Sequence, residues 1–341
     1  MKRIISLILS AVLSLLIFNS CGNNNLKKIN FKIDKDYSES TSSISNKVGD
    51  TFDTDVYNSD NVKPVLFRCE DEKGNLLYLM GTIHISGEAN DLIIDKVDDY
   101  LFESDSLAVE FDIVAYEKNY IQQTEDLKLF LYKDNSSIKD HMDSDLYERC
   151  VDFLKEGNNY YSMLDFYNLS MWAQLIDQEM YNRLDIDFEK GIDRLLINIA
   201  SENNIPILNI ESSTEQYKIT NSLTDEYNIY SIENTLNSST EDAYTYISSM
   251  YEAYVSGDVD KFTNSVSEEY DDISAEEASL INEYEEKLVI NRNNNMSQKA
   301  IEYLSSGETV FFAVGCAHLI GESGLIKQLQ SNGCTVTQIV S

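Results

Sequence analysis

The chain of 341 residues has few basic side chains for its length. Lysine and arginine number 26 against 59 aspartate and glutamate residues, which gives a formal net charge of −33 at pH 7. Nucleic acids and anionic lipid surfaces bind clusters of basic residues, so this balance argues against either as a partner. The excess of acid instead favours a soluble, well-hydrated surface.

Cysteine motifs of the kind that bind metals are also absent. The five cysteines include no C-x-x-C pair and no other spacing typical of a zinc site. Apart from Cys21 they are Cys69, Cys150, Cys316 and Cys334, and most of them lie in apolar runs. An exported protein can form disulfides, but buried free thiols explain these runs at least as well.

The N-terminus has the pattern of a targeting segment. The basic pair Lys2-Arg3 precedes an apolar run from Ile4 to Phe18, which is short for a membrane span. A small residue then precedes Cys21, so residues 1–21 resemble a lipoprotein-type signal peptide whose cysteine receives a lipid, although Phe18 stands where leucine is usual. Ordinary secretion and an uncleaved anchor are the alternatives. All three place the rest of the chain outside the cytoplasm, and lipidation anchors it to the bacterial cell membrane.

Residues 22–61 are rich in Ser, Asn, Asp, Lys and Thr, with only scattered apolar side chains. Such a segment cannot bury enough apolar surface to fold alone, so we predict a flexible polar tether. The remaining residues, 62–341, are numerous enough to bury a large core, and we predict a single domain there.

Strand-like runs occur mainly toward the two ends of this predicted domain. They cover residues 65–69, 76–80, 106–112, 205–211, 309–314 and 335–340, and the turn residues at 73–75 make the first two a hairpin. Helical spacing fills most of the rest: 91–103, 116–182, 189–202, 212–304 and 324–330. We therefore expect an α/β (α+β-like) fold, with a central mixed sheet from the N- and C-terminal parts and a large helical middle section. Asn291 to Asn295 is expected to interrupt the acidic helix before it, and Trp172 is expected in the core.

Histidine is scarce, and its placement is informative. Two of the three histidines lie in matching frames, Gly81-Thr82-Ile83-His84-Ile85-Ser86-Gly87-Glu88 and Gly315-Cys316-Ala317-His318-Leu319-Ile320-Gly321-Glu322. Each frame follows a strand-like run, and α/β proteins build sites in the loops after strand ends. Although a lone histidine of this kind is more often structural, the repetition predicts one site containing both His84 and His318.

Carboxylates are expected at the same edge of the sheet. Glu110 lies in an apolar context and needs a partner, whereas Asp112 and Glu211 are balanced between the site and the surface. Two histidines and a carboxylate are a common divalent-metal set with an open position for water, which the metal would acidify. The alternative is metal-free acid–base chemistry, with a histidine as base and a carboxylate that orients it.

Four further charged or titratable residues have weaker signals. Arg292 lies between asparagines, and it is a candidate to neutralise Glu110 or to hold an oxyanion or a substrate carboxylate, although sequence alone slightly favours a surface position. His141 has no matched partner and is interpreted as a surface residue. Glu88 and Glu322 are interpreted as caps of the helices that follow them.

Together these features resemble the TraB/PrgY/GumN family, which is related to the Tiki metalloproteases. The resemblance covers about residues 65–340 and rests on the two Gly-x-x-His frames, Glu110, Gly191-Ile192-Asp193 and Asn291-Arg292-Asn293. Cys316 departs from the family pattern, in which a small residue is common at that position. We give a location of Cys316 near the site less weight than an ordinary buried position.

The resemblance implies an α/β fold in which both histidines, Glu110 and Arg292 meet in one cleft. Tiki proteins are divalent-metal-dependent peptidases that trim a secreted signalling protein, and bacterial TraB-like members are associated with shutting down peptide pheromone signalling. It therefore implies that His84, Glu110 and His318 bind a metal such as manganese, cobalt or zinc. In the mechanism we expect, Glu110 is the third ligand or the general base, and Arg292 stabilises the developing oxyanion.

We thus expect an extracytoplasmic, lipid-anchored metal-dependent hydrolase, a peptidase that acts on a secreted peptide or protein. A second hypothesis is a non-catalytic lipoprotein that sequesters a peptide or a metal-bearing cofactor such as haem through the same histidines. A third is a purely structural surface lipoprotein, in which neither histidine matters and no metal binds.

Overall fold

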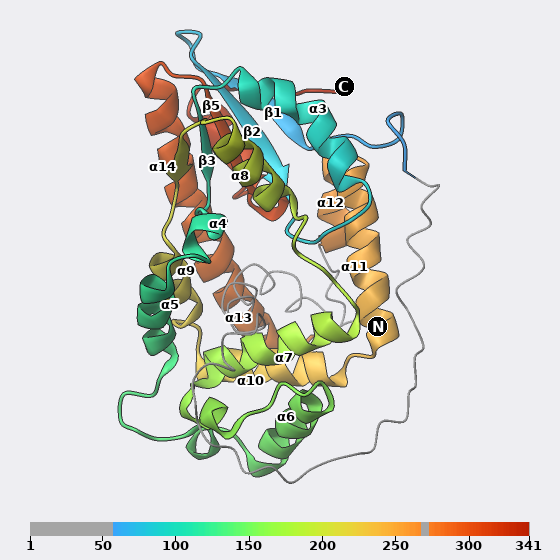
Figure 1. Cartoon of the computed structure of the whole chain (residues 1–341), viewed down its shortest axis with the longest axis vertical. Coiled ribbons are helices and arrows are strands. Elements are labelled where there is room, and N and C mark those ends of the chain that lie inside the picture. Colours follow the sequence, from blue (N-terminus) through green and yellow to red (C-terminus); the bar gives the residue numbers. More distant parts are fainter. Residues whose placement is uncertain (1–56, 267–272, 341) are drawn as a thin grey trace.

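The structure, a computed structural model, describes residues 57–266 and 273–340 (Figure 1). The expected signal peptide (1–21) and nearly all of the expected tether (22–61) lie outside the described residues. In the two described ranges, no helix is both long enough and apolar enough to cross a membrane.

The described residues contain one mixed sheet of six strands in the order β4-β3-β5-β2-β1-β6. The strands are β1 (Leu66–Glu70), β2 (Leu76–Thr82), β3 (Ser106–Val109), β4 (Ile207–Asn209), β5 (Val310–Gly315) and β6 (Thr335–Gln338). β1 is antiparallel to both β2 and β6, whereas β2, β5, β3 and β4 pair in parallel. The expected hairpin, the α/β class and a sheet built from both ends of the domain are therefore confirmed.

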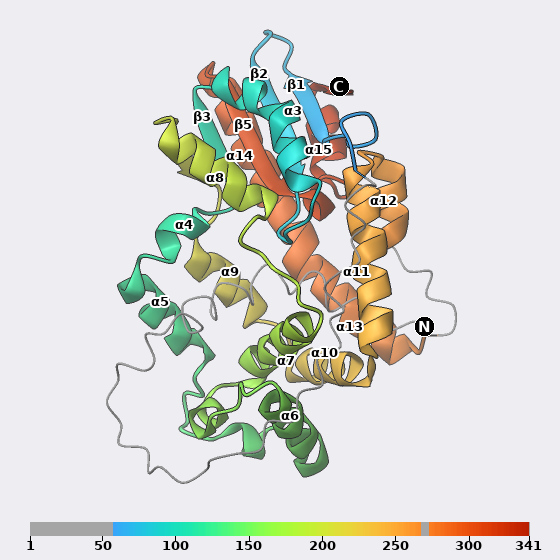
Figure 2. The ribbon, with the colours of Figure 1, turned by 45° about the vertical axis from the view of Figure 1, so that its right-hand side comes forward.

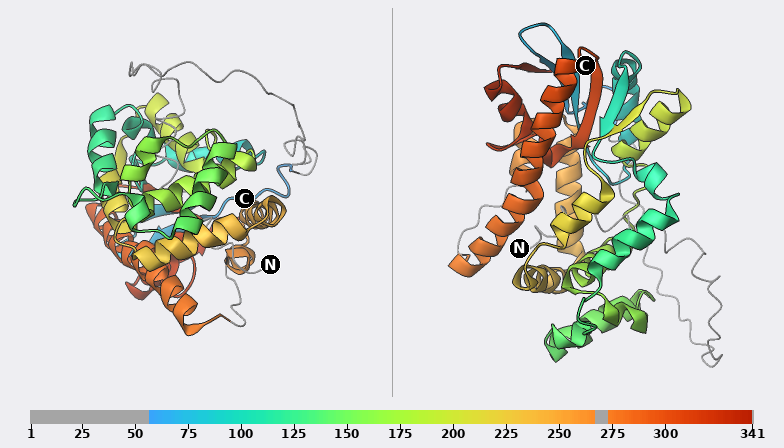
Figure 3. Two further views of the ribbon diagram at one scale, coloured as in Figure 1. Left: turned by 90° about the horizontal axis from the view of Figure 1, so that it is seen from below. Right: turned by 90° about the vertical axis from the view of Figure 1, so that its left-hand side faces the viewer.

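Helices cover both faces of this sheet. α3 (Asn90–Phe102) and α8 (Ile192–Glu202) lie on one face, and α14 (Asn291–Ser306) and α15 (Leu325–Ser331) lie on the other (Figure 3). Parallel strands buried on both faces need near-continuous apolar sequence rather than alternation. β2 and β5 satisfy this requirement, because almost every residue in both strands is buried.

The helical middle section extends away from the strand ends (Figures 1 and 2). Its helices are α4 (Ile113–Tyr116), α5 (Tyr120–Leu127), α6 (Ser144–Glu156), α7 (Leu169–Arg183), α9 (Ser213–Thr220), α10 (Asp225–Asn237), α11 (Thr240–Val255), α12 (Val259–Val266) and α13 (Ala275–Tyr284). Apart from α11 and α12, which pack into the core of the sheet, these helices contribute to a second apolar cluster, in which Trp172 of α7 is completely buried as predicted. The indole N–H of Trp172 donates to the Leu164 carbonyl at 3.0 Å.

The expected interruption at Asn291 to Asn295 is wrong. α13 continues through a π-helical segment, Glu285–Ile290, directly into α14. A π-helical turn accommodates an extra residue without ending the helix. The first turn of α14 then buries Arg292 and Asn293 instead of exposing them on a loop.

Other helix starts also differ from expectation. The helix expected from Glu189 begins at Ile192, because Gly191 has an extended N-cap conformation. Glu88 and Glu322 are not caps: the N-cap positions of α3 and α15 are Ala89 and Gly324, and neither helix has a side-chain cap. Glu322 instead forms an ion pair with Lys327.

Two tyrosines fasten α11 to the end of β2 and to the start of α3. The hydroxyl of Tyr254 donates to the Gly81 carbonyl at the end of β2, and that of Tyr251 donates to Asn90 Oδ1, both at 2.9 Å. Gly87 is required at this contact, since a Cβ atom there would lie 2.1 Å from the Tyr251 ring. The helix is therefore held directly against the frame that contains His84.

Replacing Tyr254 with phenylalanine tests this attachment. Tyr254→Phe keeps the ring but removes the only side-chain donor to the Gly81 carbonyl that the structure shows. We expect the free energy of unfolding to fall by about 1–3 kcal/mol, the cost of leaving a buried polar group unsatisfied. Urea denaturation measures the change. Tyr161→Phe, on a side chain that is 59% exposed, is the control, and an equal loss in both variants would contradict the prediction.

Candidate functional site

The candidate residues follow the parallel strands at one edge of the sheet. His84 comes shortly after β2, Glu110 directly after β3, Glu211 shortly after β4 and His318 shortly after β5. The four strands run in the same direction, so their carboxyl ends, where α/β proteins bind ligands, lie side by side. The topology therefore gathers residues that are far apart in the sequence.

Gly315, the last residue of β5, marks the point where three of these side chains converge. A Cβ atom at Gly315 would lie 3.3 Å from Glu110 Oε1, 3.7 Å from His318 Cδ2 and 3.8 Å from His84 Nε2. The Gly315 N–H donates to Glu110 Oε1 at 2.9 Å. Glycine thus keeps the space in front of the three side chains open, while its amide fixes the carboxylate.

His84 is oriented by a carboxylate from α8. Its Nδ1 lies 2.7 Å from Asp193 Oδ2, and the Thr82 hydroxyl donates to Asp193 Oδ1 at 2.5 Å. The Nε2 atom of His84 is buried and has no hydrogen-bond partner among residues 57–266 and 273–340. Burial acts to lower the pKa of His84, but the Asp193 carboxylate outweighs it, so the pKa lies above the ordinary value.

The start of α8 packs directly on the backbone of His84. The Ile192 N–H donates to the Ile83 carbonyl at 2.9 Å. A Cβ atom at Gly191 would lie 2.2 Å from the His84 carbonyl oxygen, so only glycine fits there. Gly191-Ile192-Asp193 therefore has a local function: the glycine permits the close approach, and the aspartate reaches the imidazole.

His318 is oriented by a neutral amide from α14. Its Nδ1 lies 2.6 Å from Asn293 Oδ1, while Asn293 Nδ2 donates to the Ser323 carbonyl at 3.0 Å. Because the amide oxygen accepts, Nδ1 of His318 has the hydrogen and Nε2 has the lone pair. Burial, aided by the nearby Arg292 cation, lowers the pKa of His318 to about 3, so the ring is neutral at pH 7.

Arg292 is buried behind Glu110 and joins it to Glu211. Its Nη2 donates to Glu110 Oε2 at 2.6 Å and to Glu211 Oε2 at 2.9 Å. The Gln216 amide also donates to both carboxylates, at 3.1 and 2.9 Å. Burial alone would raise the pKa of Glu110, but Arg292 and the histidines hold it well below its usual range, so Glu110 is ionised.

The structure thus brings His84, Glu110, His318 and Arg292 together and adds Glu211 to them. Arg292 is only 4% exposed, so the slight preference for a surface position was wrong. Its apolar and asparagine neighbours in sequence gave no sign of this, because burial depends on the uninterrupted helix from α13 to α14. The neutralisation of Glu110 by Arg292 is present as an ion pair.

Two other candidates lie elsewhere. Asp112 caps α4, where its Oδ1 accepts a hydrogen bond from the Ala115 N–H at 2.9 Å. His141 is partly buried rather than on the surface, because its ring stacks on Tyr132 with the centroids 4.0 Å apart. Neither residue lines the cavity beside the candidate site.

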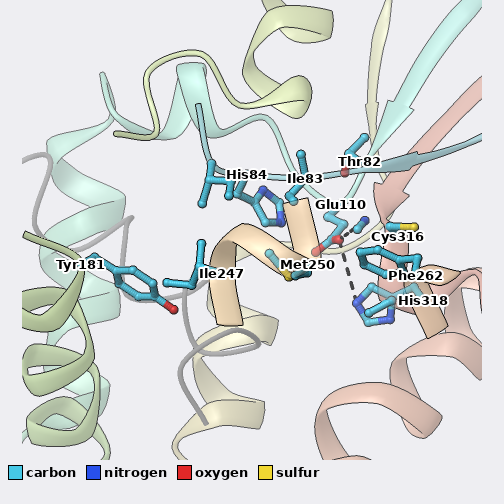
Figure 4. A pocket seen from close by; sticks show the side chains of 13 residues that line it. Thr82, Ile83, His84, Glu110, Tyr181, Ile247, Met250, Phe262, Cys316 and His318 are labelled. Carbon is cyan, nitrogen blue, oxygen red and sulfur yellow. Dashed lines mark hydrogen bonds and ion pairs between the residues drawn. The ribbon is translucent and has the colours of Figure 1, made fainter. Parts of the chain in front are cut away.

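A cavity opens from the three converging side chains (Figure 4). It has about 610 Å³ of empty space, counting the part open to solvent, and apolar side chains from α11 and α12 form much of its lining. Cys316 also lines the cavity, a position that sequence had given less weight. Burial raises the pKa of the Cys316 thiol, and all four cysteines within the described ranges are free.

The donor chemistry of the site fits a divalent metal ion. Each histidine has its Nδ1 fixed by an oxygen atom, which leaves the lone pair of Nε2 free to coordinate a metal. This is the usual arrangement of metal-binding histidines. Glu110 adds an ionised oxygen, and its Oε1 lies 3.9 Å from His318 Nε2. In the described part of the chain, no three such side chains are already arranged around a common metal position.

The model of the TraB/PrgY/gumN family matches residues 65–338. The matched span begins just before β1, ends with β6 and includes every residue of the candidate site. No curated protein and no solved structure matches the chain.

Removing the buried cation tests the electrostatics of the site. Arg292→Met leaves Glu110 and Glu211 buried without a positive partner, and we expect a loss of about 3–5 kcal/mol in the free energy of unfolding at pH 7. Urea denaturation measures it. The control is Arg68→Met on the exposed pair with Glu70, which should cost at most about 1 kcal/mol.

The pH dependence distinguishes lost charge pairing from lost packing. In the native protein the pKa of Glu110 is lower folded than unfolded, so its stabilisation is complete at neutral pH and is lost only as the pH falls through the folded value. In Arg292→Met the pKa of Glu110 in the folded protein rises. Glu110 is then protonated as the pH falls, which removes its unpaired buried charge. The variant's deficit relative to the native protein should therefore shrink from pH 7 to pH 5, and a constant deficit would contradict this explanation.

Proposed function

The chain belongs to the TraB/PrgY/gumN family, and we propose that it is a metal-dependent hydrolase, specifically a peptidase that acts on a secreted peptide or protein. We further propose that it works outside the cytoplasm, anchored to the membrane by a lipid on Cys21. The observation that carries the hydrolase proposal is the convergence of His84, Glu110 and His318 around Gly315 at the mouth of a cavity.

In this proposal His84, His318 and Glu110 hold the metal ion. When bound, such an ion supplies Lewis-acid chemistry, because it polarises a carbonyl and makes water a stronger nucleophile. Asp193 and Asn293 hold the two imidazoles so that each presents the lone pair of Nε2. These two residues are positioning residues, since they act through the histidines.

Glu110 fits the role of ligand better than that of general base. A general base works best with a pKa near the working pH, whereas Arg292 helps to hold the pKa of Glu110 well below its usual range. Arg292 does not line the cavity and is bound to two carboxylates. We therefore assign Arg292 to keeping Glu110 ionised and in place, instead of the oxyanion role expected from sequence.

The rival mechanism is metal-free hydrolysis with His84 as the proton acceptor. The observation in its favour is the Asp193–His84 pair, which is the arrangement of a histidine base oriented by a carboxylate. The non-catalytic alternative, sequestration of a peptide or of a metal-bearing cofactor such as haem, uses the same histidines without turnover.

Metal content and peptide turnover of histidine variants test the proposal. After reconstitution with manganese, cobalt or zinc, we expect near-stoichiometric metal by mass spectrometry in the native protein and loss of it in His84→Ala and His318→Ala. Turnover of a peptide library should disappear in the same two variants. His141→Ala is the matched control, because this histidine stacks on Tyr132 away from the cavity.

The combination of the two measurements identifies the mechanism. Turnover without metal supports the metal-free rival, and bound metal or peptide without turnover supports sequestration. A native protein with neither metal nor turnover would contradict the hydrolase proposal.

Asp193→Asn provides a finer test of metal binding. The amide keeps the shape of the side chain but removes the charge that holds His84 Nδ1, so we expect a 10- to 100-fold loss of metal affinity, as is typical when a residue supporting a ligand is changed. Titration with a competing chelator measures the affinity. Asp112→Asn, which alters only the cap of α4, is the control, and unchanged affinity in Asp193→Asn would contradict this role.

A further inference from the structure

The cavity beside the candidate site has both polar and apolar lining. The converging histidines and Glu110 form the polar part, and Ile247 and Met250 of α11 with Phe262 of α12 form the apolar side, in which Figure 4 shows Phe262 next to His318. These three side chains are almost completely withdrawn from solvent, yet they border empty space. Such a space favours an apolar group over water, since water needs polar partners.

Tyr181 of α7 adds a polar atom to this apolar lining. The side chain is 1% exposed, and its ring packs edge-on against Phe188. Its hydroxyl has no hydrogen-bond partner within the part of the chain that the structure describes, and in Figure 4 it points away from α7 toward Ile247. Leaving a buried hydroxyl unpaired is costly, and burial also keeps this one protonated by raising its pKa well above the ordinary value.

Resting on the hydrolase function proposed above, we propose that this cavity binds a large apolar side chain of a peptide substrate and that the Tyr181 hydroxyl donates a hydrogen bond to a backbone carbonyl beside it. Tyr181 is then a substrate-binding residue, and Met250 and Ile247 determine which side chain fits.

Peptide chemistry matches both features of the cavity. A peptide segment offers an apolar side chain and a carbonyl acceptor a few bonds apart, which are the two groups that the apolar side and the hydroxyl would bind. An acidic substrate side chain would be desolvated here without a partner, because no lysine or arginine among the described residues lines the cavity. Since the cavity reaches Glu110, the apolar residue would lie next to the bond to be cleaved.

The test is selection from peptide pools by the whole metal-reconstituted protein. Pools of blocked peptides, randomised at all positions but one, have that position fixed as Gly, Asp, Leu or Phe. We expect the Leu and Phe pools to be retained at least about tenfold more strongly than the Gly and Asp pools, measured by ultrafiltration and mass spectrometry. Equal retention of the four pools, or no retention, would overturn the proposal.

Cleavage of the same pools separates this proposal from the hydrolase proposal. Apolar selection without cleavage supports the binding proposal and contradicts the hydrolase proposal. Cleavage without apolar selection supports the hydrolase proposal and contradicts the binding proposal.

Tyr181→Phe tests the hydroxyl. We expect peptide retention to weaken by about 2- to 12-fold, the contribution of one neutral hydrogen bond. The urea midpoint should stay the same or rise, because no partner within the described residues is lost. Tyr161→Phe is the control with an exposed hydroxyl. Retention equal to that of the native protein, or a lower urea midpoint, would contradict the assignment.

Met250→Ala tests the apolar side independently of Tyr181. The substitution enlarges the cavity, so the ratio of Phe-pool to Leu-pool retention should rise. An unchanged ratio would show that Met250 does not contact the bound side chain and would overturn its role in selection.

Discussion

The site depends on the buried ion pairs that Arg292 forms with Glu110 and Glu211. Two carboxylates, Glu110 after β3 and Glu211 after β4, face it from the end of the sheet, and α14 supplies the guanidinium from the other side. Removing these charges from water is expensive, and only close mutual pairing offsets that cost. The pairing therefore requires three chain segments to meet in one arrangement, and that arrangement presents an ionised Glu110 Oε1 to the cavity.

The two histidines have matching sequence frames but different chemistry. Asp193 is an anion and raises the pKa of His84, whereas Asn293 is neutral and leaves burial and Arg292 to lower the pKa of His318 to about 3. Groups whose surroundings push their pKa values apart take different roles in catalysis. The repeat in the sequence therefore predicts where the histidines lie, but the partner on a distant helix sets what each can do.

This division explains which parts of the site could be read from the sequence. Strand ends have local signals, so the positions of His84, Glu110 and His318 followed from apolar runs, glycine spacing and the parallel topology. Asp193 belonged to a recognisable motif, but its contact with His84 depends on how α8 packs. Tyr181 had no signal at all, because it is one of 22 tyrosines and every helix of the middle section except α12 contains at least one. Arg292 was ambiguous because asparagines, which often mark loops, here occupy a buried helical turn.

The polar groups of the site and the apolar lining of the cavity come from different parts of the molecule. The sheet edge supplies the polar groups, whereas α7, α11 and α12 supply the apolar side of the cavity. These two parts are not independent, because Tyr254 and Tyr251 fasten α11 to Gly81 and Asn90 on either side of His84. A cavity side held this firmly keeps a constant distance from the polar groups. Substitutions along α11 that spare the two tyrosines can therefore change the shape of the cavity while the histidines and Glu110 stay in place, so under the proposed function one polar site would serve different substrates.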